Sequence, residues 1–252
     1  MDKKKVLNDL VRMSANLGRP ENEYVILGEG NTSAKIDERT FYVKASGAWL
    51  CKSSEDIFVE VNTASVLDMC DGPDLTDAEI KERLAAARVD PNSKWPSIET
   101  VFHAFLLTLP GINFVGHTHP TAVNIILCSK SAEEILSARI FPDQIVYCGI
   151  RPLILPFTDP GVQLARAIKQ GVKEYVDDEG CLPKVILVRN HGLIALGSTA
   201  TEVEAITATW NKTSKVLAGA HALGGIQTMS DENVARIYTR PDEEYRREYL
   251  KK

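Results

Sequence analysis

Two histidines lie two residues apart in the stretch His117-Thr118-His119-Pro120. The apolar residues before this stretch predict a short strand, and residues two apart in a strand point to the same face. Both imidazoles would then lie on one side, where they could hold a transition metal. Pro120 ends the strand and suits the first turn of a following helix. Taken alone the pair is weak, because unrelated histidines produce the same pattern.

A third histidine strengthens the metal interpretation. The chain has five histidines, and His191 follows the apolar stretch 184–189, which predicts a buried strand. Three neutral imidazoles with an open fourth position are typical of catalytic zinc. Such an ion polarises a carbonyl or enolate oxygen, or activates a water molecule. We interpret the other two histidines as structural: His103 on a largely apolar predicted helix, and His221 in an Ala/Gly-rich stretch.

A carboxylate, Glu99, lies in the sequence Pro96-Ser97-Ile98-Glu99 at the predicted start of a helix. Ser97 is of a type that caps helices, and a carboxylate in the first turn is favoured by the helix dipole. That stabilisation alone would explain Glu99. The functional alternative is that Glu99 acts as an acid or base beside the metal.

Two segments of small and polar residues, 28–33 and 45–47, flank one predicted hairpin. Glycine lets the backbone approach a ligand closely, and backbone N–H groups with hydroxyls suit an anion. Ordinary turns contain the same residue types, and the residue types alone favour that simpler interpretation.

The composition is that of an ordinary globular protein: 252 residues, 44% hydrophobic and 25% charged. The net charge of −5 argues against a nucleic-acid surface. No stretch approaches the roughly 20 apolar residues that cross a membrane, and the N-terminus does not resemble a signal peptide. We therefore expect a cytoplasmic protein with neither nucleic acid nor membrane as a partner. The five widely spaced cysteines are expected to be reduced thiols, mostly buried.

Hydrophobic periodicity predicts the surrounding elements. No linker divides the chain, so we expect one domain, residues 1–252, with a core at about 6–220 and a polar tail at 221–252. The predicted helices include 3–17, 76–88, 162–175 and a long one capped by Thr201, with a solvated acidic loop at 177–180. The predicted strands include 40–44, 56–61, 145–147, 153–155 and 184–189.

The motifs together resemble a known family, the class II aldolase/adducin family. Its members include L-fuculose 1-phosphate aldolase and L-ribulose 5-phosphate 4-epimerase. The resemblance covers about residues 6–220 and implies an α/β domain of three α/β/α layers with a mostly antiparallel central sheet. It also implies a homotetramer with active sites at subunit interfaces. The matching motifs are Gly30-Asn31-x-Ser33, Ser46-Gly47, Pro96-Ser97-x-Glu99, His117-x-His119-Pro120 and Asn190-His191-Gly192.

The resemblance also implies roles for single residues. It makes His117, His119 and His191 the ligands of one zinc ion (Zn2+) per subunit, and Glu99 the catalytic acid/base. Lys44 could add a positive charge near the site that binds the anionic end of the substrate. The residues implied to hold that anionic end are Gly30, Asn31, Ser46, Gly47 and Ser97.

Two departures bear on the substrate and the reaction. Ile98 stands where the phosphate-binding aldolases have a serine, so a phosphate and a carboxylate both stay open. The epimerase has Asp where this chain has Glu99, which favours carbon–carbon cleavage. We expect a zinc-dependent aldolase that cleaves a ketose 1-phosphate, or a related sugar phosphate, to dihydroxyacetone phosphate and an aldehyde through an enediolate that the metal stabilises.

Other activities fit the same residues. A decarboxylase, a dehydratase or the 4-epimerase, acting on a keto acid or sugar phosphate, would use the same kind of intermediate. A non-catalytic adducin-like domain would be expected to lack the metal ligands, which are present here. A second acid must protonate the aldehyde oxygen, and the candidates are Tyr147, Tyr238 and Tyr245. The two tail tyrosines could come from a neighbouring subunit.

Overall fold

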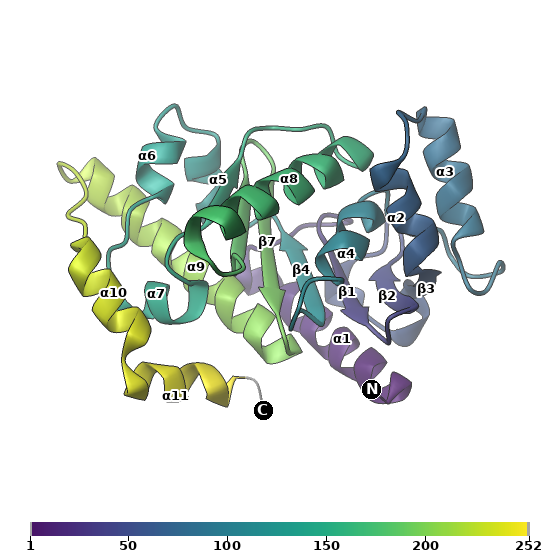
Figure 1. Cartoon of the computed structure of the whole chain (residues 1–252), viewed down its shortest axis with the longest axis horizontal. Coiled ribbons are helices and arrows are strands. Elements are labelled where there is room, and N and C mark those ends of the chain that lie inside the picture. The colour runs from purple at the N-terminus through teal and green to yellow at the C-terminus, as the bar shows by residue number, and fades with distance from the viewer. Residues whose placement is uncertain (1, 251–252) are drawn as a thin grey trace.

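The structure is a computed structural model that describes residues 2–250. Within these residues, the strands are β1 (Asn31–Lys35), β2 (Thr40–Lys44), β3 (Phe58–Asn62), β4 (Phe114–Thr118), β5 (Leu153–Leu155), β6 (Val185–Val188) and β7 (Gly192–Gly197). They form one sheet in the order β3-β2-β1-β4-β7-β6-β5 (Figure 1). All neighbours are antiparallel except β5 and β6. This confirms the predicted mostly antiparallel sheet.

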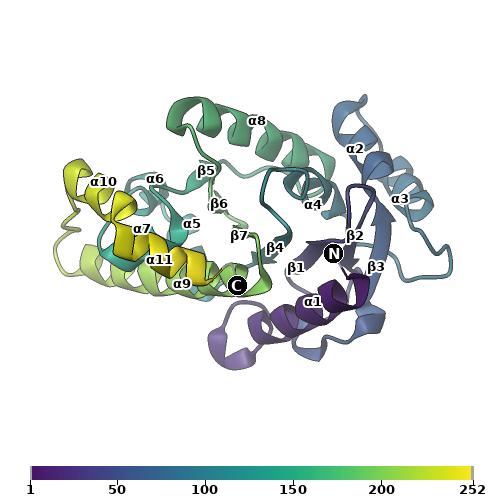
Figure 2. The same ribbon diagram turned by 60° about the horizontal axis from the view of Figure 1, so that its bottom comes forward.

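Helices cover both faces of the sheet. One layer holds α2 (Thr63–Asp71), α3 (Asp77–Ala86), α4 (Thr100–Leu106) and α8 (Val162–Glu179); the other holds α1 (Lys3–Leu17), α5 (Thr121–Leu127), α6 (Ala132–Leu136) and α9 (Ala200–Ala222). Figure 2 shows α8 and α1 on opposite sides of the strands. Because side chains alternate along a strand, β6 feeds both cores: Ile186 and Val188 pack with α4 and α8, whereas Val185 and Leu187 pack with α1 and α9. The predicted three-layer fold is thereby confirmed.

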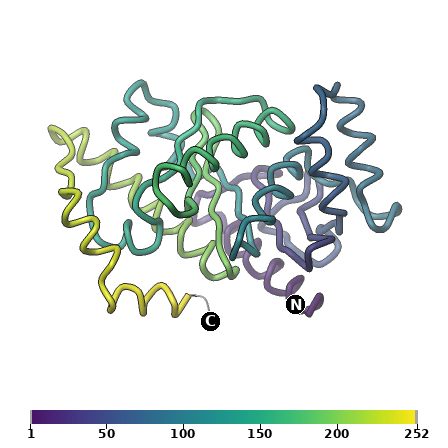
Figure 3. The backbone as a smooth tube through the Cα atoms, viewed as in Figure 1, coloured from purple at the N-terminus to yellow at the C-terminus, as the bar shows by residue number. Residues whose placement is uncertain are grey.

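The C-terminal segment forms two further helices, α10 (Asp231–Thr239) and α11 (Pro241–Tyr249), which pack on α7 (Pro142–Cys148). Figure 3 traces this segment, in yellow, along one side of the molecule. At its end, the carbonyl oxygen of Leu250 accepts a hydrogen bond from the Thr199 hydroxyl at 2.6 Å. The polar tail is therefore folded against the layer that contains α9.

The strand predicted at 145–147 was wrong, because Ile145, Val146 and Tyr147 lie in α7. Pro142 occupies the first turn, where its fixed φ suits a helix, and Gly149 ends the helix with a φ of 82°. Ile145 and Val146 are buried against α10. The two end signals and this tertiary contact outweigh the strand preference of the branched side chains.

Two predicted helix boundaries also shift. The side chain of Thr199 accepts a hydrogen bond from the backbone N–H of Glu202, so α9 is capped two residues before the predicted Thr201. Helix α8 continues to Glu179, through most of the predicted acidic loop 177–180, and is followed by Gly180, where φ is 67°. Glycine is favoured at this left-handed position.

Three short 3-10 helices lie between these elements: η1 (Pro20–Asn22), η2 (Leu50–Lys52) and η3 (Glu55–Ile57). All five cysteines are free thiols; Cys70 and Cys148 are buried, and Cys51 and Cys128 are exposed. Among residues 2–250, helix length and apolar character nowhere reach what a membrane crossing requires.

Candidate metal centre

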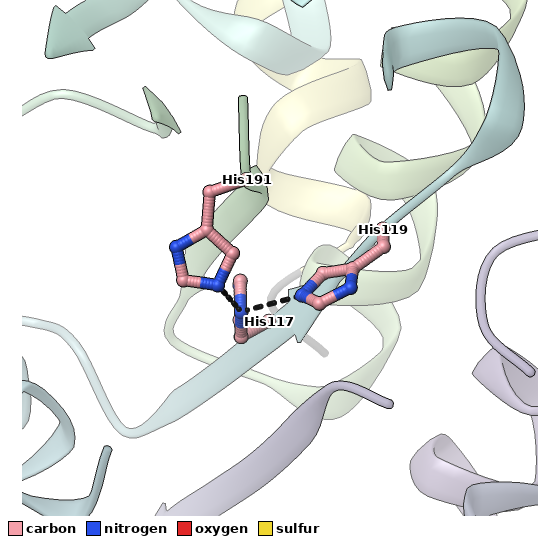
Figure 4. A group of neighbouring side chains, drawn as sticks. All are labelled: His117, His119 and His191. Carbon is pink, nitrogen blue, oxygen red and sulfur yellow. Dashed lines mark hydrogen bonds between the residues drawn. The ribbon is translucent and has the colours of Figure 1, made fainter. Parts of the chain in front are cut away.

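The three predicted ligands meet at one end of the sheet. His117 lies in β4, His119 directly follows this strand, and His191 lies in the turn between β6 and β7. Nε2 of His117 is 3.0 Å from Nε2 of His119 and 3.2 Å from Nε2 of His191 (Figure 4). The three possible ligand atoms all lie within 4.8 Å of one another. The predicted cluster therefore forms from segments that are distant in the sequence.

Strand pairing explains why these rings converge. His117 pairs with Ile194 and Thr118 with Leu193, so the end of β4 lies beside the turn that carries His191. The Nδ1–H group of His117 donates a hydrogen bond to the carbonyl oxygen of Leu193 at 3.0 Å. The proton is thereby fixed on Nδ1, and the lone pair of Nε2 faces the other two rings.

The protonation states of the rings fit a divalent cation. Burial lowers the pKa of His117, and burial together with its neighbour His117 lowers the pKa of His119 to about 3. Both rings are therefore neutral near pH 7, which is the form of histidine that binds metals. Three imidazole nitrogens with a free side suit a catalytic zinc ion, although imidazole sites also accept other divalent metals.

Glu99 lies beside the histidine cluster and is buried. Its Oε1 atom is 3.3 Å from Nε2 of His191, and its Oε2 atom is 3.6 Å from Nε2 of His117. Asn31 Nδ2 donates a hydrogen bond to Oε2 at 2.6 Å. Burial alone would raise the pKa of Glu99, but the interactions with His117, His191 and Asn31 outweigh burial and hold this pKa below its ordinary value. The carboxylate of Glu99 therefore faces the histidine cluster.

The helix after Glu99 begins later than predicted. Helix α4 starts at Thr100, so Glu99 lies at its cap position and not in its first turn. Ser97 does not cap this helix; its hydroxyl accepts a hydrogen bond from the backbone N–H of Glu99 at 3.3 Å. Ser97 thus closes the turn that directs Glu99 towards the histidines.

The two small-polar segments lie side by side, as expected from the antiparallel pairing of β1 and β2. A Cβ atom on Gly28 would lie 3.5 Å from the backbone of Gly47. Gly30 and Gly47 have φ values of 64° and 73°, which glycine adopts at no steric cost. Asn31 and Ser33, expected in a loop, instead lie in β1, which fixes their side chains on a rigid element.

Lys44 joins these two segments from inside the protein. Its side chain is buried, and Nζ donates hydrogen bonds to the carbonyl oxygens of Gly28 at 3.0 Å and Ala48 at 2.6 Å. Burial lowers the pKa of Lys44 to about 8, against an opposing contribution from the Glu99 charge. The ammonium group therefore lies next to the two small-polar segments, which form the candidate anion site. Two of its hydrogen bonds hold the backbone at that site.

Ile98 lines a cavity whose walls do not include the three histidines. Its side chain is 41% exposed and faces a cavity of about 480 Å³. Ser46 lines the same cavity, so the candidate anion site and the cavity share a wall. The other lining residues are Asp77, Ile80, Lys81, Leu84, Trp95 and Pro96.

The candidate tyrosines lie elsewhere in this chain. Tyr147, Tyr238 and Tyr245 belong to α7, α10 and α11, on the side of the molecule away from α4 (Figure 1). Arg246 donates a hydrogen bond to the Tyr147 hydroxyl at 3.0 Å. Tyr147 thus contacts α11 through its hydroxyl and its ring.

His103, which the sequence predicted to have only a structural role, is in contact with this site. His103 is completely buried in α4, with Nε2 at 2.5 Å from Asn31 Oδ1 and Nδ1 at 2.7 Å from Ser33 Oγ. Its position one helical turn after Glu99 was a usable signal, because residues four apart share a helix face. His221, by contrast, is exposed near the end of α9.

Known proteins resemble this chain over the segment that contains the histidine cluster and Glu99. The sequence model described as "Class II Aldolase and Adducin N-terminal domain" matches residues 8–217. "Uncharacterized oxidoreductase YuxG" of Bacillus subtilis is 29% identical over 181 residues, which are 69% of this chain and 24% of that protein. The chain therefore spans about a quarter of the length of that relative.

A second curated relative matches along most of its length. The 3-oxo-tetronate 4-phosphate decarboxylase of Haemophilus influenzae is 24% identical over 207 residues, covering 81% of this chain and 84% of that protein. Among solved structures, an L-fuculose 1-phosphate aldolase has a TM-score of 0.69 at 17% identity, with 98% of each chain covered. At this identity the structural similarity shows a shared fold.

Proposed function

Because this chain belongs to the class II aldolase and adducin family, we propose that it is a metal-dependent lyase of the aldolase type. The proposed reaction is cleavage of a ketose 1-phosphate, or a related sugar phosphate, to dihydroxyacetone phosphate and an aldehyde. The observation that carries this proposal is the convergence of three imidazole Nε2 atoms beside the buried carboxylate of Glu99. A purely structural domain of this fold would not require that arrangement.

The three histidines would hold one zinc ion per subunit. When bound there, zinc would supply Lewis-acid chemistry, drawing electron density from the carbonyl and neighbouring hydroxyl oxygens of the substrate. His117 is fixed for this role by its bond to Leu193. His119 and His191 complete the set from the end of β4 and the turn before β7.

Glu99 would move the proton at the carbon next to the carbonyl. In the cleavage direction, a second group accepts the proton of the hydroxyl that becomes the aldehyde oxygen. The carbon–carbon bond then breaks and its electron pair forms the enediolate. Glu99, after taking up a proton from solvent, delivers that proton to the carbon. Tyr147, Tyr238 and Tyr245 stay the candidates for the second group, with a neighbouring subunit of a homotetramer as one possible source.

The anionic end of the substrate would lie at the paired small-polar segments. Backbone N–H groups there and the hydroxyls of Ser46 and Ser97 can donate hydrogen bonds to an anion. Asn31 lies between this segment and Glu99, with Nδ2 at 3.5 Å from Ser97 Oγ. The buried charge of Lys44 would add a favourable electrostatic contribution. The substrate-binding set proposed is Gly30, Asn31, Lys44, Ser46, Gly47 and Ser97.

A decarboxylase is the second candidate function. A relative that aligns over most of both chains is named as a decarboxylase of a phosphorylated keto acid. Loss of carbon dioxide from such a compound leaves the same kind of enediolate, and Glu99 could protonate it in the same way. Ile98 cannot donate a hydrogen bond, so the anionic end of the substrate could be a carboxylate as well as a phosphate.

Proton exchange in heavy water would test the aldolase proposal. Zinc-loaded protein would be incubated with dihydroxyacetone phosphate, and loss of the signal of the exchangeable carbon-bound proton followed by NMR, with and without a chelator. Exchange that the chelator abolishes is the expected result. Absence of exchange in protein shown to contain its metal would overturn the proposed substrate, and phosphorylated keto acids would then be assayed for release of carbon dioxide.

A further inference from the structure

His103 and Glu99 are connected by a buried chain of hydrogen bonds. Strand β1 points Asn31 and Ser33 to the same face, towards α4, while Thr32 between them contacts Ser14 of α1 on the opposite face. His103 lies between Asn31 and Ser33 and uses both ring nitrogens. The ring also stacks on Phe102, with centroids 4.5 Å apart, so its plane is fixed by packing.

The donor and acceptor types allow only one direction along this chain. Nδ2 of Asn31 lies 2.6 Å from Oε2 of Glu99, and a carboxylate oxygen accepts hydrogen bonds, so the amide nitrogen of Asn31 faces this oxygen. The amide oxygen of Asn31 then faces Nε2 of His103, which must carry the proton. Nδ1 of His103 is left as an acceptor for the hydroxyl of Ser33. A neutral His103 with its proton on Nε2 therefore fixes the orientation of the Asn31 amide.

Burial is consistent with that single form of His103. The side chain is completely buried, and burial lowers its pKa to about 3. The ring is therefore neutral across the pH range in which enzymes of this kind work. With the opposite amide orientation, the oxygen of Asn31 would face the carboxylate of Glu99, and two acceptors would repel each other.

The consequence lies in the two oxygens of Glu99. Oε2 is occupied by the amide N–H of Asn31, whereas Oε1 is buried, has no hydrogen-bond partner and lies 3.3 Å from Nε2 of His191. We propose that His103 is a positioning residue: through Asn31 it holds the carboxylate of Glu99 so that Oε1, and not Oε2, exchanges the proton with the substrate. This inference rests on the proposed role of Glu99 in the lyase reaction.

Two substitutions of His103 separate hydrogen bonding from packing. His103→Phe keeps an aromatic ring against Phe102 but removes both ring nitrogens. His103→Gln keeps an N–H donor the same number of bonds from Cβ as Nε2. We expect His103→Phe to lower kcat about 10- to 100-fold, as loss of an outer hydrogen bond does at such centres, with zinc content and KM nearly unchanged. His103→Gln should recover most of this loss; equal kcat in His103→Phe and wild type would refute the proposal.

A matched control disturbs the packing of α4 but leaves the hydrogen bonds of His103 in place. Leu106 is fully buried on the same helix and takes no part in the chain. Leu106→Ala should lower the free energy of unfolding but leave kcat within about twofold below the unfolding temperature. If it lowers kcat as much as His103→Phe, the effect comes from general packing and the proposal fails.

NMR of the histidine ring tests the chain independently of turnover. In zinc-loaded protein with 15N-labelled histidine, the signals of His103 would be assigned by their absence in His103→Gln. The expected form carries its proton on Nε2, and a proton on Nδ1 would refute the proposal even if His103→Phe does not fold. If His103 carries its proton on Nε2 but the protein catalyses no proton exchange, the proposed function is refuted. The hydrogen-bond chain itself would then still stand.

Discussion

Gly192 lies directly against the ring of His119: a Cβ atom at position 192 would be 2.6 Å from Cδ2 of His119. The same atom would be 2.6 Å from the carbonyl oxygen of Thr118, which belongs to the backbone and cannot move freely. A glycine after His191 is therefore a steric requirement of the metal centre, and the Asn-His-Gly motif combines a ligand with the space its neighbour needs.

Substituting Gly192 by alanine should weaken metal binding, because the added methyl group displaces His119. We expect the zinc dissociation constant to rise about tenfold or more, as for other losses of ligand positioning, while His119→Ala should lose zinc and activity together. Gly219→Ala in α9 is the matched control, since a Cβ atom there meets nothing within 4 Å. Metal analysis after dialysis against a weak chelator would measure the effect; unchanged zinc affinity in Gly192→Ala would contradict it.

Glu99→Gln should retain zinc but lose most of its turnover. The amide oxygen can still accept the hydrogen bond from Asn31, whereas the amide nitrogen cannot act as a base. Removing a general acid or base typically lowers the rate about 10²- to 10⁴-fold. Proton exchange into dihydroxyacetone phosphate and metal content would be measured on the same sample.

A control for Glu99→Gln is available in α3. Glu79 lies in the first turn of that helix, where its side chain accepts hydrogen bonds from Thr76. Glu79→Gln should therefore affect stability alone. If Glu99→Gln kept the wild-type rate, Glu99 would be a helix-start residue like Glu79 and the acid/base role would be refuted.

Ile98→Ser should strengthen binding of a phosphate at the anion site. The change supplies a hydroxyl at a side chain that is 41% exposed, so little packing is lost. One hydrogen bond to a charged group corresponds to about a tenfold lower KM for a sugar phosphate. Ile125→Ser, at a 60% exposed position of α5, is the control. A KM that stays constant in Ile98→Ser would place the phosphate away from residue 98.

Lys44 should make the stability of the protein depend on alkaline pH. Its pKa is about 8 in the folded protein, because of burial, and 10.5 ordinarily. Between these values the unfolded chain binds more protons than the folded one, so the free energy of unfolding rises with pH. Relative to Lys44→Met, which does not titrate, the wild type should gain stability from about pH 8 to 10.5. Denaturant unfolding of both proteins at the two ends of this range would measure it, and a constant difference would contradict it.

Much of the fold could be predicted from the sequence, because the signals for strands and helices are local. The apolar runs before His117 and His191 predicted strands that the structure contains as β4 and β6. The failure at Ile145 and Val146 had a tertiary cause: their contacts with α10 are made by residues far along the chain. A short apolar run fits a buried strand or a buried helix, so periodicity over three residues could not decide, and the strand preference of branched side chains favoured the wrong element.

The candidate ligands could be predicted from the sequence, whereas the residues that support them could not. The spacing of His117 and His119, together with His191 after a second apolar stretch, indicated the cluster that the structure contains. His103 is joined to Asn31 and Ser33 across separations of 72 and 70 residues. Only the pairing of β1 with β4 and the packing of α4 bring these groups together. The one local signal is the position of His103 four residues after Glu99, and that spacing does not identify Asn31 and Ser33 as its partners.

The three ligands are held to the fold with unequal firmness, because His117 lies within a central strand. Its backbone is paired with Asn31 of β1 on one side and Ile194 of β7 on the other. His119 lies beyond the end of this strand, and His191 lies in a turn. Dissociation of the metal should therefore proceed in steps. The bond to His119 or His191 should break first, and the bond to His117 last. The order of ligand release would then be set by sheet position, and not by the chemistry of three identical imidazoles.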